Sequence, residues 1–458
     1  MGGYKFAIRT YGCQMNSRDS ENMAAMMESA GFSALEGDGG EDEYAAADVV
    51  IFNTCCVRES AEDRFLGHLG RLKPVKAAKP ELVIAVSGCM SQQERVKDLI
   101  AEKYPYVNIV IGTGNRQLLP GLVLDAMAGG GRAFDISAGT EWAEHGGSPL
   151  RREFRHRAGI NIMRGCGNFC SYCIVPYVRG PEVSRGAEGV IREAEALAKD
   201  GVREIMLLGQ NVNSYRPQGG GPSFAGLARA VAAVAGVERV RFMTSHPKDF
   251  SDELIAALRD TPKLCGHVHL PMQSGSTRVL AAMNRGYTKE RYLELVEKLR
   301  AQVPGAAITT DIIVGFPGES DEDFRHTLDA AEKARFAGAF TFIYSSRSGT
   351  PAASMHGTVP EETAKKRLGA LTGALYPMFE EHNRKKVGRV LDAMVEAGQG
   401  GVYKGRLPDN GLVHFRARAP FAPGSVVPVR ITEARTFYVL GEYDEKTTDP
   451  HDGAVRPA

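Results

Sequence analysis

Short apolar runs alternate with helical patterns along the first part of the chain. Residues 48–53 (DVVIFN) and 82–87 (LVIAVS) contain continuous apolar stretches, which are typical of strands buried on both faces of a sheet. Residues 5–10 and 108–112 have the same character. Because helical patterns separate these runs, the sequence predicts a small α/β domain with a parallel sheet over residues 4–125.

The same alternation resumes in the centre of the chain. A Gly-rich stretch of mixed charge, residues 126–151, is typical of a linker. Beyond it, strands are predicted at residues 159–164, 204–209, 239–244, 267–270, 309–314 and 340–344. Repeated βα units predict a full or partial barrel over residues 152–384, with its chemistry at the carboxyl ends of the strands.

The pattern changes again near the C-terminus, after a long amphipathic helix at residues 361–386. From Gly388 onward, short strands and Gly and Pro turns predict a small five-stranded barrel over residues 385–448. Residues 449–458 are predicted to form a polar tail. The expectation is therefore an α/β protein of three domains, which also suits a length of 458 residues.

Composition narrows the class of protein. The chain is 43% hydrophobic and 24% charged, as in ordinary globular proteins, and its net charge is +1. Any nucleic-acid surface must therefore come from local clustering of basic residues. The chain shows no signal peptide and no apolar run near about 18 residues, so we expect a cytoplasmic protein. In that compartment, eight cysteines indicate metal binding in preference to disulfides.

Three cysteines in one loop carry the most specific chemical signal. Cys166, Cys170 and Cys173, hereafter the loop triad, have the spacing C-x₃-C-x₂-C. Three thiolates at this spacing suit a [4Fe–4S] cluster whose fourth iron stays open. An open iron can chelate S-adenosylmethionine (SAM), and reductive cleavage of SAM releases a 5′-deoxyadenosyl radical. A zinc knuckle is the alternative, although zinc usually takes four ligands with paired C-x₂-C spacing.

Three further cysteines follow predicted strands in the N-terminal segment. Cys13, Cys55 and Cys89, hereafter the strand-end triad, are each flanked by Gly or small polar residues. Ligands in open α/β sheets gather outside the carboxyl ends of the strands, so we expect these thiols to converge on a second cluster. Cys56 is interpreted as a bystander, but the choice between Cys55 and Cys56 stays open. Cys265 is predicted to be a core thiol.

Polar residues at or near the ends of the central strands are candidates for SAM binding. A turn after the second central strand could meet the methionyl amine or simply cap a helix, and later strand ends could meet the ribose or carboxylate. An aromatic residue in the loop triad could lie against adenine or cover the cluster. The candidates are Tyr172, Gly209, Gln210, Asn211, Ser245, Gln273 and Asp311. No pair of residues suggests a general-base dyad, and radical hydrogen abstraction needs none.

Basic residues gather around the predicted C-terminal barrel. Small barrels bind oligonucleotides through a basic face and aromatic stacking, and Tyr403 and Phe415 are candidates for stacking. A solvated charged face is the alternative. The predicted RNA contacts are Lys385, Lys386, Arg389, Lys404, Arg406, Arg416, Arg418 and Arg430.

Taken together, nine strings resemble the radical-SAM methylthiotransferases, most closely the MiaB-type tRNA enzymes. They extend from the N-terminus to about residue 350 and are YGCQMNSRDSE, FNTCCVRESA, VSGC, RGCGNFCSYCIVPYVRG, LLGQNVNSY, MTSHP, HLPMQSGS, MNRGYT and DIIVGFPGE. Two positions depart from the family pattern. Gly167 stands where relatives often carry Asp or Asn, and Cys56 stands where Ser is usual.

The resemblance implies a methylthiotransferase N-terminal domain, a radical-SAM core and a C-terminal TRAM domain. It also implies two [4Fe–4S] clusters, two SAM molecules per turnover, and 2-methylthiolation of N6-isopentenyladenosine next to the tRNA anticodon. The loop-triad cluster would cleave SAM, and the radical would take hydrogen from C2 of the base. The strand-end cluster would present sulfur, which a second SAM methylates. The implied partners are tRNA, an electron donor such as flavodoxin or ferredoxin, and iron–sulfur or sulfur carrier proteins.

Two other functions stay open at this point. Relatives perform the same chemistry on N6-threonylcarbamoyladenosine in tRNA or on an aspartate of a small-subunit ribosomal protein. The strings TSHP and YGCQMN favour the isopentenyladenosine branch by resemblance. A non-catalytic RNA-binding iron–sulfur protein is the second alternative, and it would release no 5′-deoxyadenosine from SAM and a strong reductant.

Overall fold

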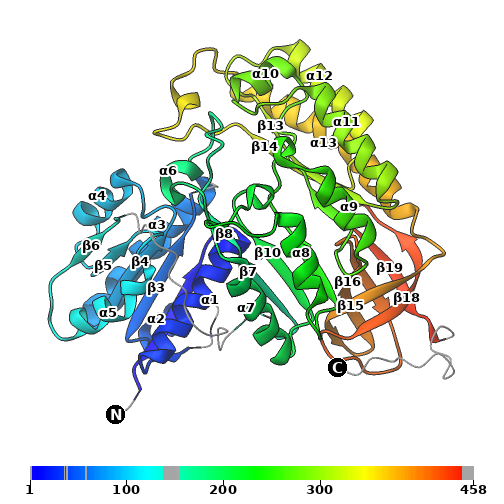
Figure 1. Cartoon of the computed structure of the whole chain (residues 1–458). Coiled ribbons are helices and arrows are strands. Elements are labelled where there is room, and N and C mark those ends of the chain that lie inside the picture. Colours follow the sequence, from blue (N-terminus) through cyan, green and yellow to red (C-terminus); the bar gives the residue numbers. More distant parts are fainter. Residues whose placement is uncertain are drawn as a thin grey trace. The chain divides into compact units, whose positions relative to one another are not determined.

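The computed structural model, traced in Figure 1, describes residues 3–35, 37, 40–56, 59–137, 152 and 154–445. The chain divides into two compact units. Unit 1 is Met1–Glu153, Met163–Gly167 and Ile174–Arg185, and unit 2 is Phe154–Ile162, Asn168–Cys173 and Gly186–Ala458. Unit 2 thus contains both the central segment and the C-terminal barrel, and the predicted boundaries of three domains stay a prediction.

Unit 1 is built on a six-stranded parallel sheet with the order β2-β1-β3-β4-β5-β6. Its strands are β1 (Lys5–Thr10), β2 (Ser33–Ala34), β3 (Val49–Thr54), β4 (Val83–Gly88), β5 (Ile109–Ile111) and β6 (Ala133–Asp135). The four predicted strands are confirmed. The edge strand β6 falls inside the stretch predicted as a linker, and residues 138–151 of that stretch lie outside the described residues.

Helices cover both faces of this sheet (Figure 1). One face packs on α1 (Gln14–Ser29) and α5 (Leu119–Met127), with Met23, Met27 and Val123 in the core. The other face packs on helices whose bounds are α2 (Glu41–Ala46), α3 (Glu59–Ala78) and α4 (Glu94–Lys103). Every residue of β3 and β4 is buried, which explains the continuous apolar runs of their sequences.

Four short elements complete unit 1. They are the one-turn helix η1 (Arg116–Leu118), the helix α6 (Val175–Arg179), and the antiparallel pair β8 (Met163–Arg164) and β9 (Val183–Ser184). The loop triad therefore crosses a boundary between the units. Cys166 belongs to unit 1, whereas Cys170 and Cys173 belong to unit 2.

The first part of unit 2 is an open parallel array, so the partial barrel is confirmed. Two three-stranded sheets have the orders β11-β10-β7 and β12-β13-β14, and a parallel bridge from Val240 to Leu264 links β11 to the segment before β12. Within the described residues, β7 and β14 do not pair with each other. The strands are β7 (Arg157–Asn161), β10 (Glu204–Leu208), β11 (Arg239–Phe242), β12 (His267–His269), β13 (Ala307–Val314) and β14 (Gly338–Ile343).

Helices connect these strands and begin where the sequence supplies caps. Ser251, Ser276, Thr288 and Ser320 each accept a backbone N–H at a helix start, and Ser320 and Asp323 form a capping box. The helices are α7 (Ala187–Lys199), α8 (Phe224–Ala233), α9 (Asp252–Asp260), α10 (Thr277–Ala282), α11 (Lys289–Gln302), α12 (Asp321–Ala334) and α13 (Glu361–Arg384), with single turns η2 (Val212–Ser214), η3 (Pro247–Asp249) and η4 (Pro351–Ser354).

The C-terminal part of unit 2 is the predicted five-stranded barrel, and it is closed in the order β15-β16-β17-β19-β18. Its strands are β15 (Val390–Gln399), β16 (Val402–Arg406), β17 (Leu412–Arg416), β18 (Val426–Ala434) and β19 (Tyr438–Tyr443). The core contains Val395, Val413, Phe415 and Val429 among its buried side chains. Closure leaves no free sheet edge in this part of the molecule. The polar tail predicted at residues 449–458 lies outside the described residues.

Two arginines of β11, a strand of the open array, form hydrogen bonds to the backbone of this barrel. Arg239 donates to the backbone oxygens of Arg406 (2.7 Å) and Asp392 (2.9 Å). Arg241 donates to the backbone oxygens of Leu407 and Pro408, both at 2.9 Å. Because both guanidinium groups are buried, these bonds form a fixed joint within unit 2.

Candidate functional site

The strand-end triad lies at one edge of the unit 1 sheet, as predicted. Cys55 and Cys89 directly follow β3 and β4, and Cys13 lies between β1 and α1. These three strands are neighbours in the sheet. Gly12 and Gly88, both with φ of +108°, make the close approach possible. A Cβ on Gly12 would lie 2.3 Å from the Cβ of Cys55, and one on Gly88 would lie 2.3 Å from the oxygen of Thr54.

The thiols of this edge interact in two pairs. A hydrogen bond from Cys55 lowers the pKa of Cys13 to about 6, and the charge of Arg179 acts in the same direction. A hydrogen bond from Cys56 lowers the pKa of Cys89 to about 7, whereas the same bond raises the pKa of Cys56. Cys13 and Cys89 therefore favour the thiolate form that iron requires. Cys56 also faces the thiols, so the choice of Cys55 over Cys56 stays a prediction.

Arg179, the last residue of α6, is a buried cation that the sequence analysis did not single out. Its Nε donates to Sγ of Cys89 at 2.9 Å. Its Nη1 and Nη2 donate to Asp19 at 2.8 Å and to Asn16 at 2.7 Å. All four residues belong to unit 1. The string YVRG contained this arginine, but nothing local in the sequence indicated its partners.

The part of the loop triad that belongs to unit 2 is held by the connection between α10 and α11. Ser171 donates from its backbone N–H to Met283 (3.0 Å) and from its hydroxyl to Ala282 (2.8 Å). Nη1 of the buried Arg285 lies 3.4 Å from both Sγ of Cys170 and the hydroxyl of Tyr172. A second buried guanidinium thus donates to a predicted cluster ligand, and it too was missed although MNRGYT contains it.

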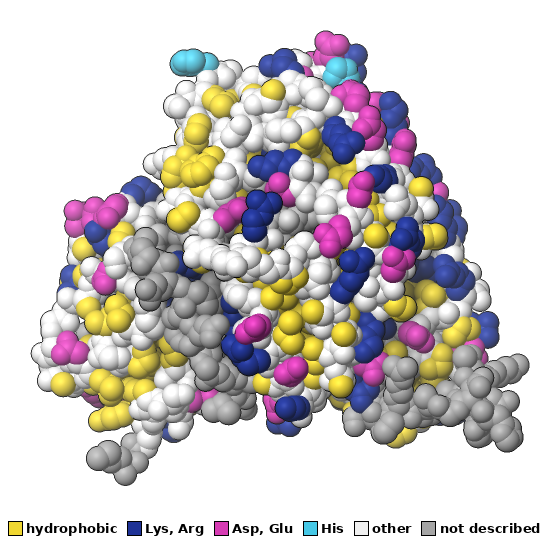
Figure 2. Space-filling view, in the orientation of Figure 1, with side chains coloured by type: hydrophobic (Ala, Val, Ile, Leu, Met, Phe, Trp, Pro, Cys, Tyr) yellow, Lys and Arg dark blue, Asp and Glu magenta, His cyan; other side chains and the backbone are white. Residues whose placement is uncertain are grey.

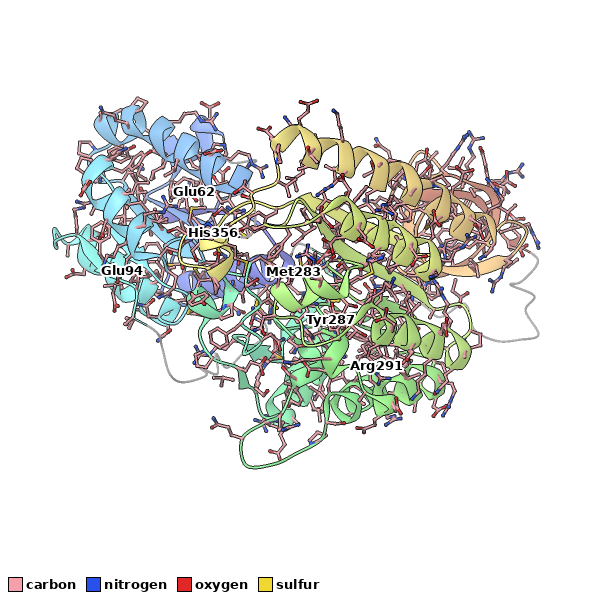
Figure 3. All side chains as sticks on the ribbon, turned by 90° about the horizontal axis from the view of Figure 1, so that it is seen from above. Glu62, Glu94, Met283, Tyr287, Arg291 and His356 are labelled. Carbon is pink, nitrogen blue, oxygen red and sulfur yellow. The ribbon has the colours of Figure 1, made fainter. Side chains whose placement is uncertain are left out.

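Arg285 also ties this loop to the strand ends of the open array. It donates to the oxygen of Pro271 (2.9 Å) and to the hydroxyl of Tyr287 (3.1 Å), and Tyr287 donates to Met272 (2.9 Å). The rings of Tyr287 and His246 meet edge to face at 5.8 Å. Figure 3 labels Met283 and Tyr287 on this part of the ribbon. The strand ends of the array and the loop around Cys170 therefore form one continuous site within unit 2.

Cys166 and Gly167, which belong to unit 1, form backbone hydrogen bonds to other residues of unit 1. The N–H of Cys166 donates to Gly180 at 3.2 Å, and the N–H of Gly167 donates to the carboxylate of Glu182 at 3.2 Å. The departure at Gly167 thus leaves its backbone anchored by an acidic side chain.

The polar residues predicted at the ends of β10 and β11 are brought together. Gly209 and Gln210 are partly buried between β10 and η2, and Asn211 is buried. The N–H of Val212 donates to Thr244 at 3.1 Å, which brings the segment of Asn211 beside that of Ser245. Nδ2 of Asn211 donates to Asp249 at 2.7 Å.

Buried polar atoms at the ends of β7, β10 and β11 include four that find no hydrogen-bond partner in the described part of the protein. They are Oδ1 of Asn161, Oδ1 of Asn211, Oγ of Ser245 and Nε2 of His246. Burial lowers the pKa of His246 to about 2, so its ring is neutral. Since its Nδ1 accepts the N–H of Lys248 (3.3 Å), its Nε2 carries the proton and is a donor. Buried acceptors and a donor of this kind suit the polar groups of SAM.

The other two candidates lie together, with Asp311 inside β13 and Gln273 in the segment that follows β12. The N–H of Gln273 donates to the backbone oxygen of Asp311 at 2.8 Å, and Gln273 has a positive φ of 68°. The Asp311 carboxylate lies 3.4 Å from Nε2 of His269. The site therefore has polar groups on both halves of the array.

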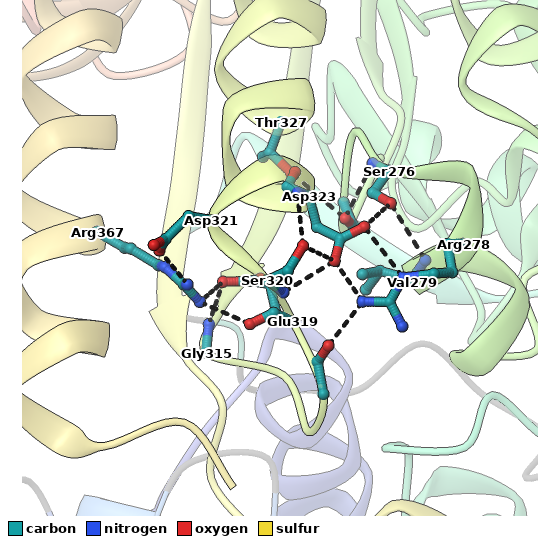
Figure 4. Close-up of polar contacts among 12 residues, drawn as sticks. Ser276, Arg278, Val279, Gly315, Glu319, Ser320, Asp321, Asp323, Thr327 and Arg367 are labelled. Atoms are coloured by element: carbon teal, nitrogen blue, oxygen red, sulfur yellow. Dashed lines mark hydrogen bonds and ion pairs between the residues drawn. The ribbon is translucent and has the colours of Figure 1, made fainter. Parts of the chain in front are cut away.

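A separate polar network, drawn in Figure 4, supports the loop that follows β13. Asp323 accepts from Ser276 at 2.6 Å and pairs with Arg278, while Arg367 of α13 pairs with Glu319 at 2.6 Å. Burial alone would raise the pKa of Asp323, but the bonds from Arg278 and Ser276 hold it well below its usual range. The carboxylates of Asp323 and Glu319 are each paired with a guanidinium group, so the network supports this loop.

The predicted RNA contacts of the barrel differ in how accessible they are. Lys386 is buried, with its ammonium 2.5 Å from Asp409, and is therefore not available to a phosphate. Arg406 and Lys404 pair with Glu396 at 3.0 and 3.5 Å. Arg430 pairs with Asp444 at 2.9 Å. The exposed members of the set are Lys385, Arg389, Lys404, Arg416, Arg418 and Arg430.

The prediction that Tyr403 and Phe415 stack on RNA bases is wrong. Both are buried in the barrel core, where their rings stack on each other at 5.3 Å. Figure 2 shows, on the right-hand side that carries α11 to α13 and the barrel, basic side chains interspersed with acidic ones. Cys265 is buried, as predicted for a core thiol.

Both donor sets consist of thiols, which are the usual ligands of iron–sulfur clusters. No disulfide joins any of the eight cysteines, all of which are described. Among the described residues, no three Cys, His, Asp or Glu side chains converge as ligands of one metal ion. A cubane cluster instead takes one thiolate for each ligated iron. Thiols, guanidinium donors to sulfur and unpaired polar atoms at strand ends are the groups that clusters and SAM require.

Comparison with known proteins agrees with this site. Residues 160–331 match the Radical SAM superfamily, and residues 5–112 match a family described as Uncharacterized protein family UPF0004. In fold, the chain resembles the radical S-adenosylmethionine methyltransferase TsrM from Kitasatospora setae, with a TM-score of 0.56 at 15% identity over 87% of this chain and 79% of that one. None of the helices in the described residues has the length and apolar character needed to cross a membrane.

Much closer relatives share nearly the whole chain. The tRNA-2-methylthio-N(6)-dimethylallyladenosine synthase of Acetivibrio thermocellus is 46% identical over 95% of this chain and 90% of its own. The enzyme of the same name from Alkaliphilus oremlandii is 45% identical over 96% of this chain and 92% of its own. The chain therefore belongs to the tRNA-2-methylthio-N(6)-dimethylallyladenosine synthase family, within the radical SAM superfamily.

Proposed function

We propose that the protein converts N6-isopentenyladenosine in tRNA, next to the anticodon, to 2-methylthio-N6-isopentenyladenosine. The observation that carries this proposal is the presence of two thiol sites, each with a buried arginine that donates to one of its sulfurs. SAM cleavage needs only one cluster with an open iron. A second thiol site suits a reaction that also inserts sulfur and a methyl group.

The chain's own residues hold and orient the reacting groups. When bound, the two [4Fe–4S] clusters and SAM supply the electron, the radical, the sulfur and the methyl group. The loop triad would hold the SAM-cleaving cluster, and the strand-end triad would hold the sulfur-bearing one. Arg285 fixes Cys170 through a charge-assisted hydrogen bond. The Tyr172 hydroxyl lies 3.4 Å from the same Nη1.

The unpaired polar atoms at the strand ends would bind SAM. Acceptors on Asn161, Asn211 and Ser245 suit the ammonium group and the ribose hydroxyls, and the N–H of His246 suits a carboxylate. Gly209 and Gln210, after β10, and Gln273 and Asp311, from the half of the array that contains β12 and β13, complete the proposed set. No residue has to accept a proton from C2, because the hydrogen leaves as an atom.

The partners follow from this chemistry. The exposed cations of the barrel would contact tRNA phosphates, which positions the anticodon loop without reading its sequence. An electron donor such as flavodoxin or ferredoxin would reduce the loop-triad cluster. Iron–sulfur or sulfur carrier proteins would rebuild the strand-end cluster in the cytoplasm after each turnover.

Anaerobic reconstitution tests the proposal. The full chain, loaded with iron and sulfide, is incubated with SAM, dithionite and tRNA that carries isopentenyladenosine. We expect 5′-deoxyadenosine and a nucleoside heavier by one methylthio group, both measured by mass spectrometry. Matched tRNAs with unmodified adenosine or N6-threonylcarbamoyladenosine should give little product. A preference for the threonylcarbamoyl tRNA would overturn the substrate, and absence of 5′-deoxyadenosine would leave a non-catalytic RNA-binding protein.

A further inference from the structure

Arg179 forms an unusual set of contacts for a buried arginine. It lies between an acidic residue, an amide and a thiol, with donor distances of 2.8 Å to Asp19, 2.7 Å to Asn16 and 2.9 Å to Cys89. The Asp19 carboxylate and Asn16 already satisfy its two Nη atoms, so Nε is left for the sulfur. A charge-assisted N–H donor is therefore aimed at one predicted ligand of the strand-end cluster.

A second arginine also pairs with Asp19, so neutralising this carboxylate does not by itself explain why Arg179 contacts Cys89. Arg116 of η1 reaches the other oxygen of Asp19 at 3.1 Å, so this carboxylate faces two guanidinium groups. Of the two, only Arg179 has a hydrogen bond to sulfur within the described residues. The chain thus contains a natural pair of arginines that share one carboxylate and differ in their contact with the thiol.

The position of Arg179 along the chain adds a second observation. It follows Cys173, the last cysteine of the loop triad, by six residues. Within unit 1, Ile174 and Val178 of this segment pack against Cys56 and Cys89, and the oxygen of Val178 accepts from Thr113 at 2.7 Å. The segment that follows the last cysteine of the loop triad therefore ends with an arginine that contacts the strand-end triad.

From these contacts we infer that Arg179 is a positioning residue that sets the reduction potential of the strand-end cluster through its hydrogen bond to Cys89. The inference rests on the proposed assignment of a cluster to the strand-end triad. Hydrogen bonds to cluster sulfurs draw electron density from them and stabilise the reduced, more negative form. A cluster that lacks this donor is then harder to reduce.

The test measures a potential and needs no tRNA. In the full chain with Cys166, Cys170 and Cys173 all replaced by Ala, only the strand-end cluster stays. Its midpoint potential is measured by dithionite titration followed by electron paramagnetic resonance, in which the cluster takes up one electron and no protein bond changes. The variants are Arg179→Lys and Arg179→Gln, and the matched controls are Arg116→Lys and Arg116→Gln.

We expect both Arg179 variants to have a more negative midpoint potential, so that the ratio of reduced to oxidised cluster falls about tenfold at a given potential. For a one-electron reduction, this corresponds to a shift of about 59 mV. The Arg116 variants, which keep the bond to Cys89, should shift it much less. Equal shifts for the two arginines, or none, would overturn the inference. A cluster lost from both Arg179 variants but kept in Arg116→Lys would also overturn it, since Arg179 would then serve only the fold.

This result is independent of the reaction on tRNA. A chain without tRNA activity can still show the Arg179-dependent potential, and an active chain can lack it. If no variant and no control binds iron in the strand-end triad, the cluster assignment itself fails and the inference fails with it. Iron and sulfide contents of each protein, measured before titration, separate these cases.

Discussion

The loop triad and the strand-end triad use the same residue type but are assembled in opposite ways. The loop triad lies within eight consecutive residues, 166–173, and its spacing alone defines the site. The strand-end triad is drawn from positions 13, 55 and 89, and only the order β1-β3-β4 brings these together. A local site can be recognised in any fold, whereas the second site exists only if the whole sheet is formed.

The same difference appears in the arginines that support the two sites. Arg285 reaches Cys170 from a connection between helices that lies more than a hundred residues later, and it also binds Pro271 and Tyr287. Arg179 reaches Cys89 from a short helix that directly follows the loop triad. The local thiol site is thus contacted by a remote arginine, and the dispersed site is contacted by one from the local segment.

The largest effect that separates the two sites is expected from Cys170→Ala. Removing one of three thiolates from the loop cluster should abolish 5′-deoxyadenosine formation, because the iron that binds SAM is lost with the cluster. The strand-end cluster should be retained, as measured by iron content and absorption. Normal SAM cleavage in this variant would show that the loop triad is not the SAM-cleaving site.

Cys55→Ala should have the complementary effect. SAM cleavage should persist while methylthiolation of tRNA stops, because the two sites have separate tasks. Cys56→Ala is the matched control, and we expect it to be close to silent. If the two phenotypes are exchanged, Cys56 is the ligand, and if both variants keep full methylthiolation, the second cluster is in doubt. Product nucleosides and 5′-deoxyadenosine are measured in the same reaction.

Replacing Arg285 by Lys tests whether the loop triad depends on its remote arginine. We expect 5′-deoxyadenosine formation to fall by about tenfold to a hundredfold, as for residues that orient metal ligands. Lysine keeps the charge but lacks the planar fork that contacts Cys170, Pro271 and Tyr287 together. The control is Arg291→Lys, an exposed residue of α11 labelled in Figure 3. Equal rates for the two variants would contradict the dependence.

Asp409→Asn tests stability in the C-terminal part of unit 2. Burial alone would raise the pKa of Asp409, but His382 and Lys386 hold it well below its usual range. Its stabilising contribution is thus present above the unfolded pKa of about 3.9 and lost as the pH falls below that value. Removing this partner of a buried pair should cost about 3 kcal/mol at pH 7.

Urea unfolding of wild type and Asp409→Asn from pH 7 down to about pH 3 measures this contribution. The difference between the two proteins should shrink as the pH falls. A constant difference across this range would mean that the carboxylate charge contributes nothing to stability.

The smallest effect is expected on the surface of the barrel. Replacing Arg416 and Arg418 by Gln should weaken tRNA binding with little dependence on tRNA sequence, and the salt slope should flatten by about one unit for each phosphate that is no longer neutralised. SAM cleavage without tRNA should be unchanged. Arg192→Gln, an exposed residue of α7, is the control. Equal affinities and slopes for the two proteins would move the RNA site elsewhere.

How much the sequence predicted depends on whether the signal was local. The helix predicted at residues 361–386 is α13, which begins at the same residue and ends two residues earlier, because its apolar residues repeat at helical spacing. The loop triad was also predictable from the sequence, because its C-x₃-C-x₂-C spacing lies within one short segment. Arg179 and Arg285, by contrast, were missed because an arginine in a sequence reveals neither its burial nor its partners.

The error at Tyr403 and Phe415 has a different physical cause. Alternation along a strand separates two faces but does not say which face points into a closed barrel. Tyr403 and Phe415 are paired across β16 and β17, so they share a face, and that face is the inside. Lys386, two residues after α13, was misjudged for a related reason, since its charge did not reveal that it is buried against Asp409.

The joint between β11 and the C-terminal barrel bears on how such proteins evolve. Arg239 and Arg241 hold the barrel through four of its main-chain oxygens. Every amino acid presents the same carbonyl, so the barrel's surface can diverge freely while the attachment persists. A barrel of unrelated sequence with the same turns could be exchanged into this position, provided that the two arginines are kept. The charge of the barrel surface could then change between lineages without any change in the two arginines that hold the barrel.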